Sequence, residues 1–303
     1  AVQDLARAAD LFLPIHRRTG GMAGFVSLEV SPLLAYDAEK TVAQARALHA
    51  KAARPNLFIK IPGTRAGLPA IEEAIFAGIP INVTLLFSPD HYLAAADAYL
   101  RGLERRRTAG QSLAVASVAS LFLSRWDVAV SESAPSEPRN CLGVAVGRQA
   151  YQAYRDVLES ERWQRLANAG ARPQRLLFAS TGTKDPGASD VLYVRGLAAP
   201  HTVNTMPEKT LLAFADHGEL NGVIPGSGGD AEQVLAAFNR AGIDTGQLAA
   251  RLQEDGARAF VADLGLAGPA PVRAAVTLER LEYCILLDED GNKRFIRGPG
   301  VVF

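Results

Sequence analysis

Short apolar runs alternate with longer alanine- and leucine-rich stretches along most of the chain. The short runs are apolar almost throughout, which is typical of parallel strands covered on both faces, and the longer stretches have helical periodicity. This alternation predicts βα units around a parallel sheet. The predicted strands are residues 25–30, 57–61, 81–87, 114–123, 175–180 and 202–205. The predicted helices are residues 1–16, 37–53, 66–77, 89–107, 148–168, 207–217, 230–241 and 245–263.

Polar residues interrupt the predicted strands near their C-terminal ends. In a βα barrel these ends meet at one rim, where catalytic groups gather. The alternation therefore predicts a site that draws on several strands at once. The polar residues concerned are Glu29, Lys60, Asn82, Thr84, Ser120, Ser180 and Asn204.

The last segment of the chain departs from the βα pattern. Within residues 265–303, two β-rich runs flank Asp288-Glu-Asp-Gly-Asn292, which predicts a hairpin. We therefore expect a barrel-like domain over residues 1–264 and a separate tail over residues 265–303. The Ser-, Glu- and Pro-containing stretch 131–139 is predicted to be a loop.

Composition narrows the classes of protein that remain. The chain of 303 residues is 48% hydrophobic and 21% charged, as expected of a globular protein. Its 32 basic and 32 acidic residues balance, which argues against nucleic acid or an anionic membrane as a partner. Two distant cysteines and five scattered histidines have no metal-ligand spacing. Without an apolar run of ~18 residues or a signal-like start, the expected location is the cytoplasm.

Lys60 is the strongest candidate for chemistry, because it has apolar neighbours on both sides within a predicted strand. Burial disfavours the ammonium form and so favours the neutral amine that attacks a carbonyl. The alternative is a lysine whose aliphatic stem is buried while its amine reaches solvent at the rim. The residues of this strand leave both possibilities open.

Six motifs occur in a specific order: FVSLEVSP from Phe25, NLFIKIPGT from Asn56, INVTLLFS from Ile81, ASVASLFLSR from Ala116, FASTGTK from Phe178 and TVNTMPEKT from Thr202. Their order and spacing resemble the third to eighth strands of transaldolases, especially the bacterial branch with VNTMPEKT in its last strand. The resemblance implies a (β/α)8 TIM barrel, of which six strands are recognisable here. It also implies cofactor-independent transfer of a dihydroxyacetone unit between sugar phosphates.

The resemblance further implies roles for three residues at the reacting centre. Lys60 would form the Schiff base with the donor ketose, and the iminium would act as an electron sink. Glu29 and Thr84 would hold a water that carries protons during imine formation and hydrolysis. The plainer alternatives are a rim salt bridge from Glu29 to Lys60 and ordinary strand hydrogen bonding by Thr84.

Six more residues are implied to bind the substrate. Asn82 would orient hydroxyl groups, and Phe122 would line the pocket. Ser120 and Arg125 would bind hydroxyl and phosphate, for which the planar guanidinium is well suited. Ser180 and Lys184 would complete a phosphate site after the seventh strand of the barrel. For Arg125 the alternative is a surface charge, and for Ser180 it is an ordinary βα turn.

The match to transaldolases is incomplete. The resemblance implies two further strands, one with an acid/base aspartate and one with a substrate-binding asparagine, and residues before Phe25 match neither. We therefore expect the chain to begin inside the domain and six strands to leave unpaired edges, one of which the tail could cover. Asp288, Glu289 or Asp290 could replace the aspartate. A Schiff-base aldolase acting on fructose 6-phosphate and an inactive barrel fragment that binds partners remain alternatives, and the oligomeric state stays open.

Overall fold

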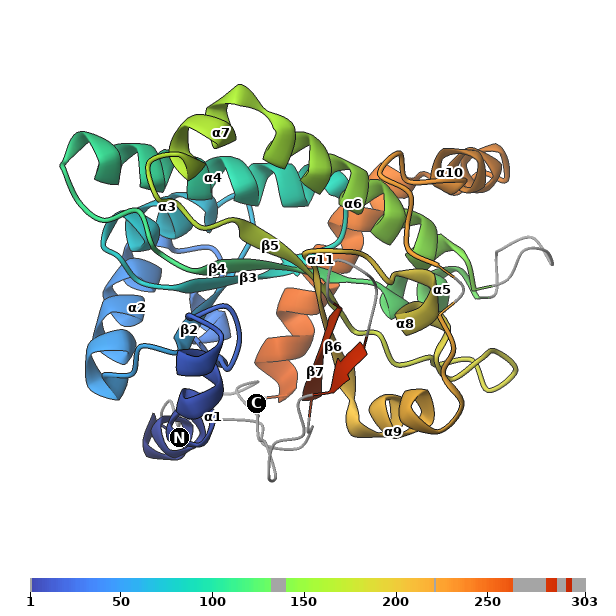
Figure 1. Ribbon diagram of the computed structural model, residues 1–303. Coiled ribbons are helices and arrows are strands. Elements are labelled where there is room, and N and C mark those ends of the chain that lie inside the picture. The colour runs from blue at the N-terminus through green and yellow to red at the C-terminus, as the bar shows by residue number, and fades with distance from the viewer. Residues whose placement is uncertain (1, 132–139, 221, 264–281, 288–292, 296–303) are drawn as a thin grey trace.

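The computed structural model describes residues 2–131, 140–220, 222–263, 282–287 and 293–295 (Figure 1). Its strands form one sheet in chain order, and the first six run parallel. They are β1 (Val26–Glu29), β2 (Leu57–Pro62), β3 (Ile81–Leu86), β4 (Ser117–Phe122), β5 (Gln174–Ala179) and β6 (Val203–Pro207). All six predicted strands are confirmed, and the sheet is the incomplete barrel that the sequence predicts.

The tail contributes two strands to this sheet. β7 (Glu282–Leu287) pairs antiparallel with β6, and β8 (Lys293–Phe295) pairs antiparallel with β7. The two predicted hairpin strands are thus confirmed, and they cover the edge of β6. Asp288, Glu289 and Asp290 lie outside the described residues, as does the segment 264–281. The division of the chain at residue 264 therefore stays a prediction.

Helices cover the outer face of the sheet and enclose the larger apolar core. Alternate strand residues such as Ile59, Val83 and Leu121 belong to this core. Figure 1 shows α3, α4 and α6 side by side over this face. The helices on this side are α1 (Val2–Arg18), α2 (Ala38–Ala52), α3 (Leu68–Phe76), α4 (Pro89–Thr108), α6 (Leu142–Glu159) and α7 (Glu161–Ala167).

The predicted helix 148–168 is in fact two helices with an earlier start. Ser160 has an extended ψ of 142°, and its hydroxyl accepts a hydrogen bond from Trp163 N, so it ends α6 and caps α7. The start of α6 is fixed by Asp127, whose carboxylate accepts hydrogen bonds from the amides of Leu142 and Gly143. A cap supplied from a distant part of the chain leaves no local pattern, which explains the error.

The inner face of the sheet packs against a second apolar core. Phe58, Phe122 and Leu177 contribute from the strands, and Leu248 and Leu252 contribute from α11 (Thr245–Asp263). In Figure 1, α11 lies on the other side of the sheet from α3 and α4. The remaining elements are η1 (Pro32–Leu34), α5 (Ser124–Val130), α8 (Leu192–Gly196), α9 (Glu208–His217) and α10 (Ala231–Arg240).

Three of these elements, η1, α5 and α8, were not predicted. Each is too short to display helical periodicity in the sequence. The described helices include none whose length and apolar character would suit it to crossing a membrane.

Candidate active site

A row of polar side chains crosses the inner face of the sheet close to its carboxyl edge. Glu29 on β1, Lys60 on β2 and Asn82 on β3 are partners in the strand register. Adjacent residues in register point to the same face of a sheet, so their side chains form one row. The Lys60 Nζ lies 3.6 Å from Glu29 Oε2, and these side chains are 23% and 30% exposed. The Lys60 side chain is therefore mostly covered by protein, and its amine has a carboxylate beside it.

Two buried polar atoms of this row have no hydrogen-bond partner among the described residues: Glu29 Oε1 and Thr84 Oγ1. Thr84 pairs in register with Pro62, two residues beyond Lys60, and so points to the face that carries the amine. Buried polar atoms are nearly always satisfied by protein, water or ligand. A carboxylate oxygen and a hydroxyl on the strands flanking Lys60 suit a water molecule or a substrate hydroxyl.

Asn82 and Ser120 are joined in a hydrogen-bonded chain with a residue that the sequence analysis missed. Ser120 Oγ donates to Asn82 Oδ1 over 2.7 Å, and Asn82 Nδ2 donates to Ser27 Oγ over 3.1 Å. These two hydrogen bonds fix the orientation of the Asn82 amide and link β1, β3 and β4. Ser27 could have been found from its place two residues before Glu29, which puts both side chains on the same face.

Arg125 lies in the first turn of α5, directly after β4, and contacts two aromatic rings. Its Cζ is 5.1 Å from the ring centroid of Phe122 and 5.9 Å from that of Phe260 on α11. The Phe260 centroid is also 5.6 Å from Lys60 Nζ. These separations are within the range of cation–π interactions. The structure thus brings Lys60, Phe122 and Arg125 together, and adds Phe260, which no strand pattern in the sequence could have placed here.

Ser180 follows β5 and lies beside the start of α5. Its backbone has a φ of 55°, in the left-handed region, and its Oγ is 2.8 Å from Ser124 Oγ. The Ser124 amide also donates to the Ser180 carbonyl. Ser180 is therefore held beside Ser124, the residue that precedes Arg125 in the chain. Lys184 lies farther along the same loop and is exposed, so the structure places it at the surface rather than within the row.

The next turn contains Thr181, whose hydroxyl lies 2.9 Å from Asn204 Oδ1 and 2.8 Å from the Thr205 carbonyl. These contacts fasten the loop after β5 to β6. Asn204, the polar residue predicted near the end of the sixth strand, thus contributes to the shape of the rim by accepting a hydrogen bond from Thr181.

Other titratable groups near the rim have structural partners. Burial raises the pKa of Asp127, which caps α6 and accepts a hydrogen bond from Tyr193 Oη over 2.7 Å. Burial also raises the pKa of Cys141 to about 11, so this thiol is protonated and unreactive at neutral pH. In the described part of the chain, no cluster of three histidine, cysteine or acidic side chains could hold a metal ion.

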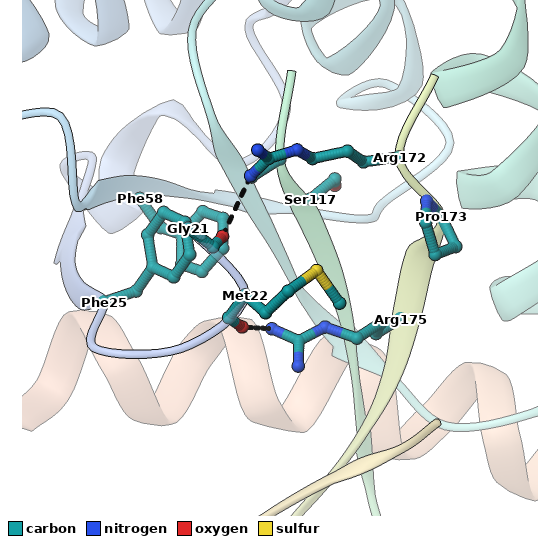
Figure 2. Close-up of a pocket in the computed structure, with 9 residues that line it drawn as sticks. Gly21, Met22, Phe25, Phe58, Ser117, Arg172, Pro173 and Arg175 are labelled. Atoms are coloured by element: carbon teal, nitrogen blue, oxygen red, sulfur yellow. Dashed lines mark hydrogen bonds between the residues drawn. The ribbon is translucent and has the colours of Figure 1, made fainter. Parts of the chain in front are cut away.

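The opposite end of the strands has a different construction, and Figure 2 shows the pocket there. Arg172 donates hydrogen bonds to the carbonyls of Gly20 and Gly21, and Arg175 donates to that of Met22. Phe25 stacks on Phe58 with 4.1 Å between ring centroids. The loop before β1 is thereby fastened across the amino end of the sheet, and this pocket lies away from Lys60.

A partly covered lysine beside a carboxylate, at the carboxyl edge of a parallel βα sheet, is an arrangement suited to Schiff-base chemistry in a βα-barrel enzyme. Residues 1–267 match the sequence profile of the family "Transaldolase/Fructose-6-phosphate aldolase". The chain belongs to this family, which confirms the resemblance predicted from its motifs.

Individual relatives agree with this assignment. The chain is 47% identical over 266 residues to a transaldolase of Parafrankia sp. (strain EAN1pec), a match that covers 85% of this chain and 72% of the relative. It is 48% identical over 269 residues to a transaldolase of Mycobacterium bovis (strain BCG / Pasteur 1173P2), covering 86% and 72%. A transaldolase of Thermobifida fusca (strain YX) is 48% identical over 267 residues, covering 85% and 73%.

Proposed function

We propose that this protein is a transaldolase of the pentose phosphate pathway. It transfers a dihydroxyacetone unit from sedoheptulose 7-phosphate to glyceraldehyde 3-phosphate, and the products are erythrose 4-phosphate and fructose 6-phosphate. The observation that carries this proposal is the Lys60 side chain, which is mostly covered by protein and whose amine lies 3.6 Å from the Glu29 carboxylate. Family membership supports the same activity.

In the proposed mechanism, the Lys60 amine attacks the ketose carbonyl and forms a carbinolamine. Loss of water then gives an iminium ion, and water re-enters at the end to release the product. Both steps need a group that gives and takes protons near the nitrogen. Glu29 and Thr84 suit this task, because each has a buried oxygen without a hydrogen-bond partner in the described part of the chain. A water held by these two oxygens would carry the protons.

The iminium accepts the electron pair of the bond between the α and β carbons of the donor when that bond breaks, which leaves an enamine on Lys60 and releases the first product as an aldehyde. The acceptor aldehyde then takes the resulting enamine carbon as its nucleophile, which restores the iminium. We assign the hydroxyl groups of the sugar to Asn82 and Ser120, whose mutual hydrogen bond fixes the amide. We assign the phosphate to Arg125 and Ser180, with Lys184 as a further cation and Phe122 as the pocket wall.

Bond cleavage also requires a base for the hydroxyl proton of the donor. The matched motifs include no counterpart of the aspartate that the resemblance assigns to this step. In the described structure, Glu29 is the carboxylate in ion-pair contact with Lys60. We therefore separate two activities: capture of the ketose as an imine, and complete transfer to an acceptor.

The experiment for capture is incubation with fructose 6-phosphate and borohydride, followed by intact-protein mass spectrometry. The proposal predicts one sugar adduct per chain, and the absence of an adduct would contradict it. Transfer is measured separately, by release of glyceraldehyde 3-phosphate from fructose 6-phosphate with erythrose 4-phosphate as the acceptor.

The second candidate is aldol cleavage of fructose 6-phosphate without an acceptor, because the matched family includes fructose-6-phosphate aldolases. Dependence of the rate on the acceptor distinguishes the two: a transaldolase requires erythrose 4-phosphate, whereas an aldolase does not. A cytoplasmic location is part of the proposal and is supported by the neutral formal charge and the two cysteines of the chain. Fractionation of the source cells tests it.

A further inference from the structure

Phe260 on α11 is within cation–π distance of both cations of the candidate active site. Its ring centroid lies 5.6 Å from Lys60 Nζ and 5.9 Å from Arg125 Cζ. The same guanidinium lies 5.1 Å from the ring centroid of Phe122. Arg125 thus contacts one ring from the end of β4 and another from a helix much later in the chain, so its orientation depends on two separate elements.

Contacts other than Phe260 itself hold α11 against the rim. Gln253 Nε2 donates hydrogen bonds to the carbonyls of Gly63 at 3.2 Å and Leu85 at 2.9 Å. At Gly256, a Cβ would come within 2.9 Å of Leu85 Cδ2 and 3.1 Å of Arg125 Nη1. The helix backbone therefore lies close to the rim at Gly256, and a Cβ there would require the ends of the Leu85 and Arg125 side chains to move. Gln253, Gly256 and Phe260 follow one another at spacings that place them on one helix face.

This position has a consequence for a bound sugar phosphate. In the proposed function, the donor carbonyl reacts with Lys60 and the donor phosphate binds Arg125. The Phe260 ring is within cation–π range of both the Lys60 amine and the Arg125 guanidinium, so it lies near the two ends of a sugar phosphate bound in this way. A phenyl ring offers no hydrogen bond to the sugar hydroxyls. Its contribution is therefore to the cations.

The contact with Arg125 favours phosphate binding for a physical reason. A flexible arginine loses conformational freedom when its planar fork aligns with a phosphate. Rings that already hold the guanidinium reduce this loss, because each cation–π contact favours one orientation of the guanidinium before the phosphate arrives. An unphosphorylated sugar makes no use of the guanidinium, so the benefit is specific to phosphorylated substrates.

We propose that Phe260 is a specificity-determining residue that favours phosphorylated over unphosphorylated ketoses by holding Arg125 ready for the phosphate. This inference rests on the proposed function in one respect, the assignment of the phosphate to Arg125. Phe260 takes no part in bond making or breaking. It is a positioning residue, and its effect is measured as the ratio of the affinity for fructose 6-phosphate to the affinity for fructose.

The test measures dissociation constants in full-length protein that carries Lys60→Met, so that no imine can form. Fructose 6-phosphate and fructose are titrated in turn and followed by NMR. Phe260→Leu removes the aromatic face and is expected to weaken binding of fructose 6-phosphate about fivefold to tenfold, with binding of fructose changed less than about twofold. Phe260→Tyr keeps the aromatic face and is expected to retain the original ratio.

Leu248→Ala is the matched control. Leu248 is buried near the other end of α11 and packs in the inner core, so this change loosens the helix without removing a ring from Arg125. The control is expected to leave the affinity ratio unchanged. The inference is overturned if Phe260→Leu leaves the ratio unchanged, if Phe260→Tyr also loses it, or if Leu248→Ala lowers it equally.

The proposed function is tested by a different result, formation of the borohydride-stable adduct in protein with Lys60 intact. An adduct together with an unaltered ratio in Phe260→Leu would reject only the role of Phe260. A lowered ratio without any adduct would reject only the Schiff-base function.

Discussion

At the amino ends of the parallel strands, Arg172 and Arg175 donate hydrogen bonds to the carbonyls of a loop, and these bonds close that end of the sheet. At the carboxyl ends, Glu29 and Thr84 each keep a buried oxygen with no partner among the described residues. Lys60 there has a carboxylate and a ring as neighbours. The two ends of the sheet thus hold cations in two settings, one hydrogen-bonded to backbone carbonyls and one facing side chains that can exchange protons.

The amino end of the sheet therefore contributes mainly to stability, whereas the carboxyl end contains the candidate active site. Asn56 and Gln174, near the amino end, also have a buried amide oxygen with no partner among the described residues, but the nitrogen of each amide is hydrogen-bonded to protein. These two amides maintain the fold. At the carboxyl end, by contrast, the oxygens without a described partner belong to a carboxylate and a hydroxyl on the strands that flank Lys60, an arrangement that costs stability and is typical of functional sites.

The largest expected effect is at Lys60. Lys60→Met preserves the length of the side chain but removes the amine, so borohydride trapping with fructose 6-phosphate is expected to fall to zero. Lys184→Met is the matched control, because Lys184 is an exposed lysine in the loop after β5. It is expected to retain trapping, with weaker affinity for the sugar phosphate. Equal loss of trapping in Lys60→Met and Lys184→Met would contradict the assignment of the Schiff base to Lys60.

The next effect concerns the proton carriers. Glu29→Gln keeps the shape of the side chain but removes its basicity, and imine formation is expected to slow by about 100-fold, as for a lost general base. Thr84→Val removes one hydroxyl and is expected to slow it by about tenfold. Stopped-flow quenching with borohydride measures both rates. If neither variant slows imine formation, Glu29 is only a salt-bridge partner of Lys60.

The amino end is expected to show the opposite behaviour. Arg172→Ala leaves the carbonyls of Gly20 and Gly21 without this donor, so the free energy of unfolding should fall by about 1–3 kcal/mol. The rate of adduct formation should stay within about twofold of the wild-type value, because Arg172 lies away from Lys60. Urea titration and borohydride trapping on the same samples check both statements. Slow trapping with unchanged stability would reverse the assignment of the two ends.

The smallest effect is a pH dependence at His91. Burial lowers the pKa of His91 below its ordinary value of 6.5, against a weaker opposing effect of Asp90. Its Nδ1 accepts a hydrogen bond from the Phe87 amide, and Gln253 Nε2 lies 3.5 Å away. Because the folded-state pKa is the lower one, its stabilising contribution is complete above pH 6.5. It is lost as the pH falls from 6.5 through the folded-state pKa.

Melting temperatures measured between pH 7.5 and 5 check this prediction. His91→Asn keeps an acceptor atom near the Phe87 amide but does not titrate, so its melting curve should depend less on pH in this range. An identical pH dependence in the wild type and in His91→Asn would assign the effect to other groups.

The sequence was sufficient to predict the strands and the row of side chains at their ends. The apolar runs around Lys60 and Asn82 are local, and the alternation of faces along a strand places their side chains without knowledge of the fold. The longer helices followed from their periodicity for the same reason. What was missed depends on contacts between distant residues. The start of α6 depends on the Asp127 carboxylate, and the place of Phe260 depends on how α11 crosses the sheet.

The central claim is that the amine of Lys60 forms a Schiff base with a ketose phosphate. It is tested most directly by peptide mapping of the protein after reduction in the presence of fructose 6-phosphate. The account predicts the sugar adduct on the peptide that contains Lys60 and on no other lysine peptide. An adduct confined to another lysine, such as Lys184, would contradict it.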